Sequence, residues 1–564
     1  MPSSLRLEHA AAILALVVVL VVLWLTQRRA RQQRLRQLAS TWGLEPRVDR
    51  QGRPYDGRER RDADVDHDRY RVDDHTWDDL DLAQLVESLD RTLTGIGAQT
   101  LYRAIRQPGR DAARATRRVA AARVALDDVD ARVASQRLLL GFGEVAGWSI
   151  PAALWGALPR APAPVWALRV LAWTLPISIG LAAWLGSVPL VLVASANAVI
   201  NVGLHFRTTQ RHHSEILGVQ ELSRMVALAH GLKDTSIART AAPEIEATWT
   251  AVVRAWGRGA VRRAQRMIEP ITAIHEVREY MRAFTLGKVI TFFESCARVT
   301  RARTHLRALF DDVGEIDLSV ALARLLHEQA LAPAEIGGEA IHLVAARHPL
   351  IDGCVANDLH LEGRGLALTG FNMAGKSTFL RTVGVNVILA QSLGLCACAK
   401  YQVLAMRVLS AMRVRDDLLA GRSSFRAEAE RARTLLLAGR GAPKCLYLVD
   451  ELFRGTNPVE RTAAAIAVSR QLAQDGILLM ATHDLDVVEA LGELVTLAHF
   501  RESGASEEGL SFDYKLRPGL GTQRGAIAVL RAVGLPASVI AEAEALVGGP
   551  TSNSTNAPDP TTTA

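Results

Sequence analysis

The stretch from Val170 to Phe206 contains no Asp, Glu, Lys or Arg. It is too long for one membrane-spanning helix, which needs about 20 apolar residues. Gly186-Ser187-Val188-Pro189 lies near its middle and is typical of a turn. We therefore predict a hairpin of two short membrane spans, near 170–185 and 189–204, within a segment of about 170–205. The alternative interpretation is a buried core hairpin of a soluble domain.

The residues around and within this hairpin refine the prediction. Arginines precede it at 160 and 169 and follow it at 207 and 211. Because cytoplasmic flanks of membrane spans are enriched in Lys and Arg, both ends of the hairpin are expected in the cytoplasm. Asn197 and Asn201 lie in the second span, and such side chains often form hydrogen bonds between membrane helices. We expect them to contact the partner helix.

A second apolar run, residues 10–26, predicts an N-terminal span within an anchor of residues 1–37. Arginines at 28, 29, 31, 34 and 36 follow it, which places the next residues in the cytoplasm and the N-terminus outside. A cleaved signal peptide is the alternative, but no small-residue cleavage site follows. Three spans leave residues 336–547 in the cytoplasm, so we expect a multi-pass protein of the cell (inner) membrane.

Composition excludes two broad classes. The chain has 564 residues, of which 49% are hydrophobic and 22% charged, and this apolar content excludes a disordered chain. Five scattered cysteines exclude a disulfide scaffold, and Cys396-Ala397-Cys398 lacks a second pair at zinc spacing. The net charge of +7 comes mostly from arginine. Arginine suits both phosphate contacts and membrane orientation, so this charge does not decide between DNA and lipid.

Residues 366–383 predict a nucleotide site. Leu366-Ala367-Leu368 is typical of a buried strand, Gly370 to Ser377 matches the P-loop pattern, and a helix-compatible stretch follows. Backbone N–H groups of such a loop wrap phosphates, while Lys376 reaches the β- and γ-phosphates of ATP and Ser377 holds Mg²⁺. The predicted nucleotide-binding residues are Gly370, Asn372, Met373, Ala374, Gly375, Lys376, Ser377 and Thr378.

Two later apolar runs end in polar residues that suit ATP hydrolysis. Cys445 to Val449 predicts a strand that ends in Asp450 and Glu451. Asp450 is expected to support Mg²⁺, and Glu451 to orient and polarise the attacking water. Ile477 to Thr482 predicts another strand that ends at His483, which would contact the γ-phosphate or its water. The alternatives are two solvated acids at a strand end and an ordinary surface or core histidine.

These residues resemble the MutS family, the ATPases of DNA mismatch repair. The run from Asn372 to Thr378 is close to diagnostic of the family, since Asn-Met before the P-loop glycine is typical of its members. Asp450 to Asn457 resembles its Walker B stretch, and Ala481-Thr482-His483 its switch histidine. Gly421 to Phe425 resembles the loop that, in MutS dimers, places a serine on the ATP of the partner, and by that match the serine is Ser423.

The resemblance covers most of residues 77–545. Asp90-Arg91-Thr92 looks like the start of the family's helical core, Gly314 to Asp317 like its return, and Arg347-His348-Pro349 like the beginning of the ATPase domain. It implies an α/β P-loop NTPase (ABC/MutS-like) domain preceded by an all-α lever domain, with transmembrane helices added. The expected domains after the anchor are a charged linker 38–75, a helical core 76–335, an ATPase domain 336–547 and a disordered tail 548–564.

The resemblance also implies activity and partners. We expect Mg²⁺-dependent ATP hydrolysis in a homodimer with composite sites, coupled to binding of mismatched or branched DNA, with no small-molecule substrate beyond ATP. The sequence departs from the family in two places. Residues 38–75 leave no room for a mismatch-reading domain, and Cys354 stands near the expected adenine-stacking aromatic. The alternative function is a membrane-localised mechanical or scaffolding ATPase that does not bind DNA. An ABC transporter is disfavoured because no LSGGQ-type signature occurs.

Overall fold

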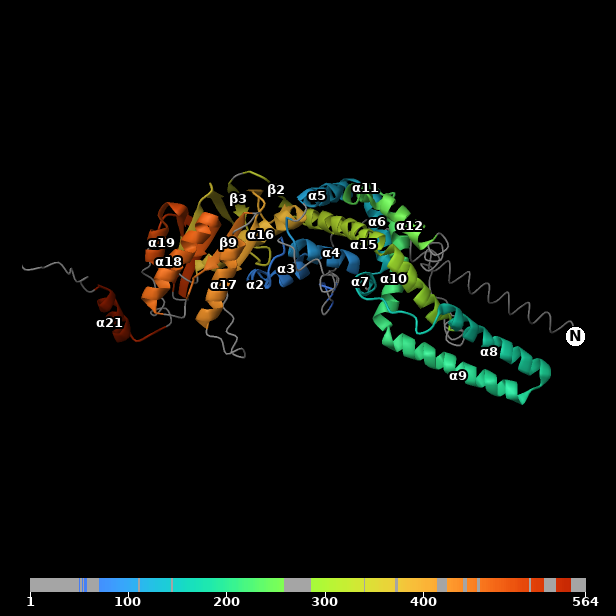
Figure 1. Ribbon diagram of the computed structural model, residues 1–564. Coiled ribbons are helices and arrows are strands. Elements are labelled where there is room, and N and C mark those ends of the chain that lie inside the picture. Colours follow the sequence, from blue (N-terminus) through green and yellow to red (C-terminus); the bar gives the residue numbers. More distant parts are fainter. Residues whose placement is uncertain are drawn as a thin grey trace, which may run out of the picture. The chain divides into compact units, whose positions relative to one another are not determined.

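The computed structural model describes residues 50, 53, 55–57, 70–109, 112–143, 146–257, 286–338, 340–370, 374–412, 424–439, 444–453, 457–506, 509–521 and 534–548. They form two compact units, which are described separately (Figure 1). The helical unit runs to Ile336 and includes Val387–Ala397, and the sheet unit comprises Gly337–Asn386 and the chain from Cys398 onward. The predicted N-terminal span, most of the linker, Phe371–Met373, Ser423 and the tail after Gly548 lie outside the described residues.

The helical unit consists mainly of helices, as expected for the all-α lever domain that the resemblance implies. These helices are α2 (Asp74–Asp79), α3 (Leu82–Leu89), α4 (Gly95–Arg106), α5 (Ala112–Asp127), α6 (Val129–Phe142), α7 (Ile150–Leu154), α10 (His213–Leu232), α11 (Ser236–Ala241), α12 (Ile245–Trp256) and α15 (Gly287–His327). Three two-residue strands, β1 (Ala332–Pro333), β2 (Glu335–Ile336) and β6 (Leu395–Cys396), complete it. At about 1.5 Å per residue, α15 is roughly 60 Å long, and it packs against α4, α5 and α12.

A buried carboxylate joins the two stretches that resemble the family's helical core. Asp317 on α15 accepts hydrogen bonds from the backbone N–H groups of Leu93 (2.8 Å) and Thr94 (2.9 Å) and from the Thr94 hydroxyl (2.6 Å). Burial raises the pKa of Asp317 to about 6. A Cβ at Gly97 would lie 2.2 Å from this carboxylate, so glycine allows α4 to approach α15. Asp317 therefore satisfies backbone donors at the start of α4.

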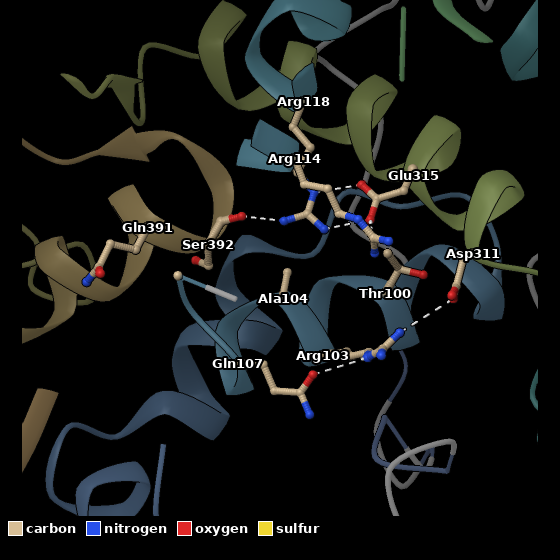
Figure 2. Close-up of a pocket in the computed structure, with 11 residues that line it drawn as sticks. Thr100, Arg103, Ala104, Gln107, Arg114, Arg118, Asp311, Glu315, Gln391 and Ser392 are labelled. Atoms are coloured by element: carbon tan, nitrogen blue, oxygen red, sulfur yellow. Dashed lines mark hydrogen bonds and ion pairs between the residues drawn. The ribbon is translucent and has the colours of Figure 1, made fainter. Parts of the chain in front are cut away.

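A polar cavity of about 260 Å³ lies in the helical unit (Figure 2). The Arg118 guanidinium donates two hydrogen bonds to Glu315, at 2.7 and 2.6 Å, and a third to the carbonyl of Ser392. Arg103 and Asp311 form a second ion pair across the cavity, at 3.6 Å. Ser392 is in the last turn of α16 (Lys376–Leu393), so Arg118 ties that turn to α15. The fork geometry of Arg118 makes this contact directional.

The uncharged stretch forms a helical hairpin of α8 (Val165–Leu185) and α9 (Val188–Arg211). Gly186, at φ +58°, makes the predicted turn between the helices. The Asn197 side-chain amide donates to the Thr174 hydroxyl, which confirms the expected contact between the two helices. By length and composition both helices suffice to cross a membrane, and only 28% and 17% of their most apolar windows are buried.

The sheet unit contains a six-stranded sheet in the order β12-β11-β5-β10-β9-β8. The strands are β5 (Gly365–Thr369), β8 (Arg407–Ala411), β9 (Cys445–Asp450), β10 (Gly476–Ala481), β11 (Val495–Ser506) and β12 (Gly509–Pro518). All neighbours are parallel except β11 and β12. Beside them, β3 (Ile341–Ala346) pairs with β4 (Asn357–Leu361) and β7 (Lys400–Val403). The helices are α16 to Asn386, α17 (Ser424–Ala438), α18 (Pro458–Asp475), α19 (Leu485–Leu491), η5 (Gly492–Leu494) and α21 (Ala537–Gly548).

Two residues of the segment predicted as a charged linker, Arg50 and Tyr55, contact the helical unit. Arg50 is 6% exposed, and its guanidinium donates to Asp90 (2.5 Å) and to Thr92 (2.7 Å). Tyr55 also donates to Asp90, at 2.9 Å. At these positions the linker interpretation is wrong. The reason is that Asp90 is itself 9% exposed and a buried carboxylate needs a charged partner.

Candidate functional site

The predicted site residues gather where three parallel strands end. Asp450 is the last residue of β9 and lies beside Ala481, the last residue of β10. The Glu451 N–H donates to the Ala481 carbonyl at 3.0 Å, and the Thr482 N–H donates to the Leu368 carbonyl at 3.1 Å. These bonds fix the chain just beyond β9 and β10. The site therefore lies outside the carboxyl ends of parallel strands, where open α/β sheets usually bind ligands.

Glycine is required in the loop that joins β5 to α16. Gly370 has φ +114° and Gly375 has φ +98°, values that side-chain-bearing residues rarely adopt. A Cβ at Gly370 would also lie 2.7 Å from the carbonyl oxygen of Phe500. The predicted strand and helix on either side of this loop are confirmed as β5 and α16. Asn372 and Met373, also predicted here, lie outside the described residues.

Lys376 occupies the centre of the site. It is 2% exposed, and its ammonium group donates to the Gly370 carbonyl and lies 3.2 Å from Nε2 of His483. Burial lowers the pKa of Lys376 to about 8, while the nearby charges of Asp450 and Glu451 act in the opposite direction. A buried cation that has little solvent around it is well placed to bind an incoming phosphate.

Glu451 and His483 lie together beside Lys376. Nε2 of His483 is 3.3 Å from a carboxylate oxygen of Glu451. Glu451 has φ +56°, and Phe453 two residues later has φ +62°. Such left-handed conformations are costly for residues with a side chain and often occur at functional sites. The fold thus holds the Glu451 carboxylate beside His483 and Lys376. Neither the end of β9 nor the end of β10 would by itself require this contact.

Ser377 and Asp450 supply oxygen ligands that fit Mg²⁺. The Ser377 hydroxyl, in the first turn of α16, donates directly to the Asp450 carboxylate at the end of β9. Hydroxyl and carboxylate oxygens are the hard donors that Mg²⁺ prefers, and Mg²⁺ is usually held by few protein ligands. The contact brings together the two residues predicted as metal ligands. Their roles remain predictions.

A cavity of about 550 Å³ opens beside these residues. Ser377 and Thr378 line one part of it, and Cys354, Phe500 and Tyr514 line another. Tyr514, on β12, is 45% exposed, and its carbonyl accepts a hydrogen bond from Asn357 at 2.9 Å. Tyr514 is not among the predicted site residues, because no motif marks it. The only available signal was an aromatic residue in β12. This strand pairs with β11, which in turn pairs with β5.

The pKa of Lys376 predicts a pH dependence of nucleotide binding. Below about pH 8 the ammonium is already charged, so ATP affinity is constant. Above pH 8 the free protein must take up a proton to bind phosphate, and Kd is expected to rise about tenfold per pH unit until the pKa of the complex is reached. Titration with ATP from pH 7 to 9.5 measures this. Lys376→Arg, which stays charged, should flatten the profile, and a flat wild-type profile would contradict the prediction.

The geometry first defines a class, an open α/β domain with a strand–glycine loop–helix site suited to phosphates. Residues 366–548 match the family described as MutS domain V. The DNA mismatch repair protein MutS 2 of Halobacterium salinarum is 30% identical over 45% of this chain and 30% of its own length. MutS of Sorangium cellulosum is 33% identical over 44% of this chain and 29% of its own length. These matches support the resemblance to the MutS family for this part of the chain, and the aligned region spans less than a third of these relatives.

Proposed function

We propose that the sheet unit hydrolyses ATP with Mg²⁺. One observation carries the proposal, namely the placement of buried Lys376 within 3.2 Å of His483, whose Nε2 is 3.3 Å from the Glu451 carboxylate. A phosphate-binding cation, a carboxylate base and an imidazole in one cluster are what attack of water on a γ-phosphate needs. The test is Mg²⁺-dependent phosphate release by the purified full chain in detergent. No release above buffer would remove the proposal.

Each residue has a distinct role in this proposal. Lys376 binds the phosphate oxygens and offsets their charge. Glu451 orients the attacking water and accepts its proton as the new P–O bond forms and the bond to the leaving ADP oxygen breaks. His483 contacts the γ-phosphate or this water. Ser377 and Asp450 would hold Mg²⁺, which neutralises phosphate charge when bound.

Tyr514 is proposed to stack on the adenine. Its side chain lines the cavity that continues from Ser377 and Thr378, where Cys354 offers no aromatic face. Stacking of a base on an aromatic side chain contributes about 1–3 kcal/mol. Tyr514→Ala is therefore expected to weaken ATP binding about tenfold or more, with tripolyphosphate binding unchanged, as measured by competition. Tyr514→Phe should retain affinity, and equal loss of ATP and tripolyphosphate would argue against stacking.

The site is proposed to be completed by a second copy of the chain. The support is the resemblance of the loop around Ser423 to the MutS loop that reaches the partner's ATP. Ser423→Ala is expected to weaken cooperative turnover while ATP binding to one protomer persists. Specific activity measured against protein concentration would show this as a loss of its steep rise. Wild-type kinetics in the variant would argue against a shared site.

The hairpin of α8 and α9 is proposed to attach the protein to the cell membrane, with the ATPase in the cytoplasm. Trp166, Trp173 and Trp184 are 69%, 68% and 81% exposed on it, more than a core hairpin would leave uncovered. Ser187, at the tip of the hairpin, then lies on the side of the cell membrane opposite the cytoplasm. In intact cells, Ser187→Cys is expected to react with a membrane-impermeant maleimide, whereas Ser236→Cys is not. Labelling of neither or both would contradict this topology.

Two outputs of the ATPase remain distinct proposals. The curated relatives are named DNA mismatch repair proteins, which favours coupling to mismatched or branched DNA. The exposed apolar hairpin favours the second candidate, a membrane-localised mechanical ATPase that touches no DNA. Binding of homoduplex, mismatched and branched DNA, measured against salt, separates them. No binding at low salt, with ATPase unaffected by DNA, would eliminate the first.

A further inference from the structure

We propose that the root of the hairpin binds the headgroups of anionic phospholipids. The surface, called here the basic collar, consists of Arg160, Arg169, Arg207, Arg211, Arg298 and Arg301. This proposal rests on the membrane attachment proposed above and adds a lipid preference to it. The attachment itself needs only apolar helices, whereas the collar adds a preference for lipids of one charge.

Among the described residues, the collar is basic because its arginines outnumber the nearby acids, which include Glu294 on α15 and Glu215 in the first turn of α10. No Asp or Glu occurs from Val145 to Ser214, while four arginines do. In the first part of α15, residues 287–310, Glu294 is the only acid. Arg160, Arg169, Arg207 and Arg211 are all exposed. Counted over the described residues, the surface therefore carries a local excess of positive charge.

Side-chain contacts bring Arg169, Arg298 and the end of α9 to one place. Arg169 on α8 pairs with Glu294 on α15, and Arg298 pairs with the same carboxylate at 3.1 Å. The ring of His212, which follows α9, stacks on Phe292 of α15 with centroids 6.0 Å apart. Both helices of the hairpin thus begin or end against the start of α15 (Figure 1). One carboxylate is shared by two of the arginines.

The collar lies at the right depth for headgroups. From the turn at Gly186, the uncharged helices extend roughly 25–30 Å before Arg169 and Arg207 are reached, at about 1.5 Å per residue. This matches the hydrocarbon thickness of about 30 Å. Trp166 near the root and Trp184 near the tip are the exposed aromatics expected at the two interfaces. With the tip at one interface, the arginines lie in the headgroup layer of the other.

The chemistry favours lipid over nucleic acid at this surface. A guanidinium binds a phosphate through two parallel hydrogen bonds, which either ligand could accept. The apolar helices begin directly beside the arginines, however, and a headgroup phosphate is attached to the acyl chains that would cover them. A duplex would leave those helices uncovered. Each basic residue near an anionic membrane contributes about 1 kcal/mol, so a group of four is a measurable preference.

The experiment compares two variants of equal charge. The collar variant carries Arg160→Gln, Arg169→Gln, Arg207→Gln and Arg211→Gln. The control variant carries Arg123→Gln, Arg137→Gln, Arg239→Gln and Arg254→Gln, all exposed positions of the helical unit away from the hairpin. Native mass spectrometry of the detergent-solubilised full chain measures binding of phosphatidylglycerol against phosphatidylcholine with the same acyl chains. The arginines at 28–36 are present in wild type and in both variants, so the comparison isolates the effect of the collar.

We expect wild type and the control variant to prefer phosphatidylglycerol, and the collar variant to lose about tenfold or more of that preference. Equal preference in all three, or none in any, would overturn the collar. Maleimide labelling of Ser187→Cys, described above, tests the attachment by the hairpin separately. If this labelling occurs while lipid preference is absent, the collar fails and the attachment stands. Duplex DNA that binds wild type and control but not the collar variant, without any phosphatidylglycerol preference, would instead assign the arginines to nucleic acid.

Discussion

Glu451→Gln is expected to lower ATP turnover by about 10²- to 10⁴-fold while ATP binding is retained. The amide has nearly the shape of the carboxylate, but it cannot accept the proton of the attacking water. Lys376, Ser377 and Asp450 remain in place to hold the nucleotide. Because the carboxylate acts only as the reaction proceeds, its loss should appear in kcat and not in Kd.

Phosphate release and equilibrium ATP binding are measured on the same purified protein. The matched control is Glu460→Gln, an exposed acid on α18 in the same unit, which should keep wild-type kcat. A Glu451→Gln variant with unchanged turnover would remove Glu451 from its role. Loss of binding together with turnover would mean that the carboxylate supports the loop and not the chemistry. The left-handed backbone at Glu451 makes that comparison necessary.

Local sequence signals predicted the parts of the fold that are determined by neighbours along the chain. The apolar run before Gly370 forms β5, and the loop glycines precede α16, because these conformations follow from residues within one turn of each other. The hairpin was predictable for a similar reason. An uncharged stretch with a Gly-Ser-Val-Pro break can satisfy its backbone only as two helices if it meets lipid.

Contacts between distant residues were not predictable from these signals. Arg50 seemed a solvated residue of a charged segment, but Asp90 binds it 40 positions away. Asp317 and Thr94 are 223 positions apart, and only the packing of α4 on α15 brings them together. Tyr514 reaches the cavity because β12 pairs with β11 at the sheet edge. Motifs identify the residues that contact phosphate. The other residues that line the cavity, such as Tyr514, are placed by strand order, which no motif predicts.

Lys376→Ala is expected to weaken ATP binding by about 2–5 kcal/mol, roughly 30- to 4000-fold in Kd. The alanine removes the buried ammonium that faces the phosphates, and the remaining loop offers only backbone N–H groups. Measured in the Glu451→Gln background, where turnover does not consume ATP, the loss reports binding alone. The rise of Kd above pH 8 should disappear in the same variant, since Lys376 is the group that titrates.

Lys444→Ala is the matched control, because Lys444 is exposed in the same unit, just before β9. It should change neither Kd nor its pH dependence. Wild-type affinity in Lys376→Ala would contradict the assignment of the loop as the phosphate site, and the ATPase proposal would fall with it. Weak binding with an unchanged rise above pH 8 would retain the site but assign the titration to another group. Because these two readouts are independent, the variant separates the position of Lys376 from its pKa.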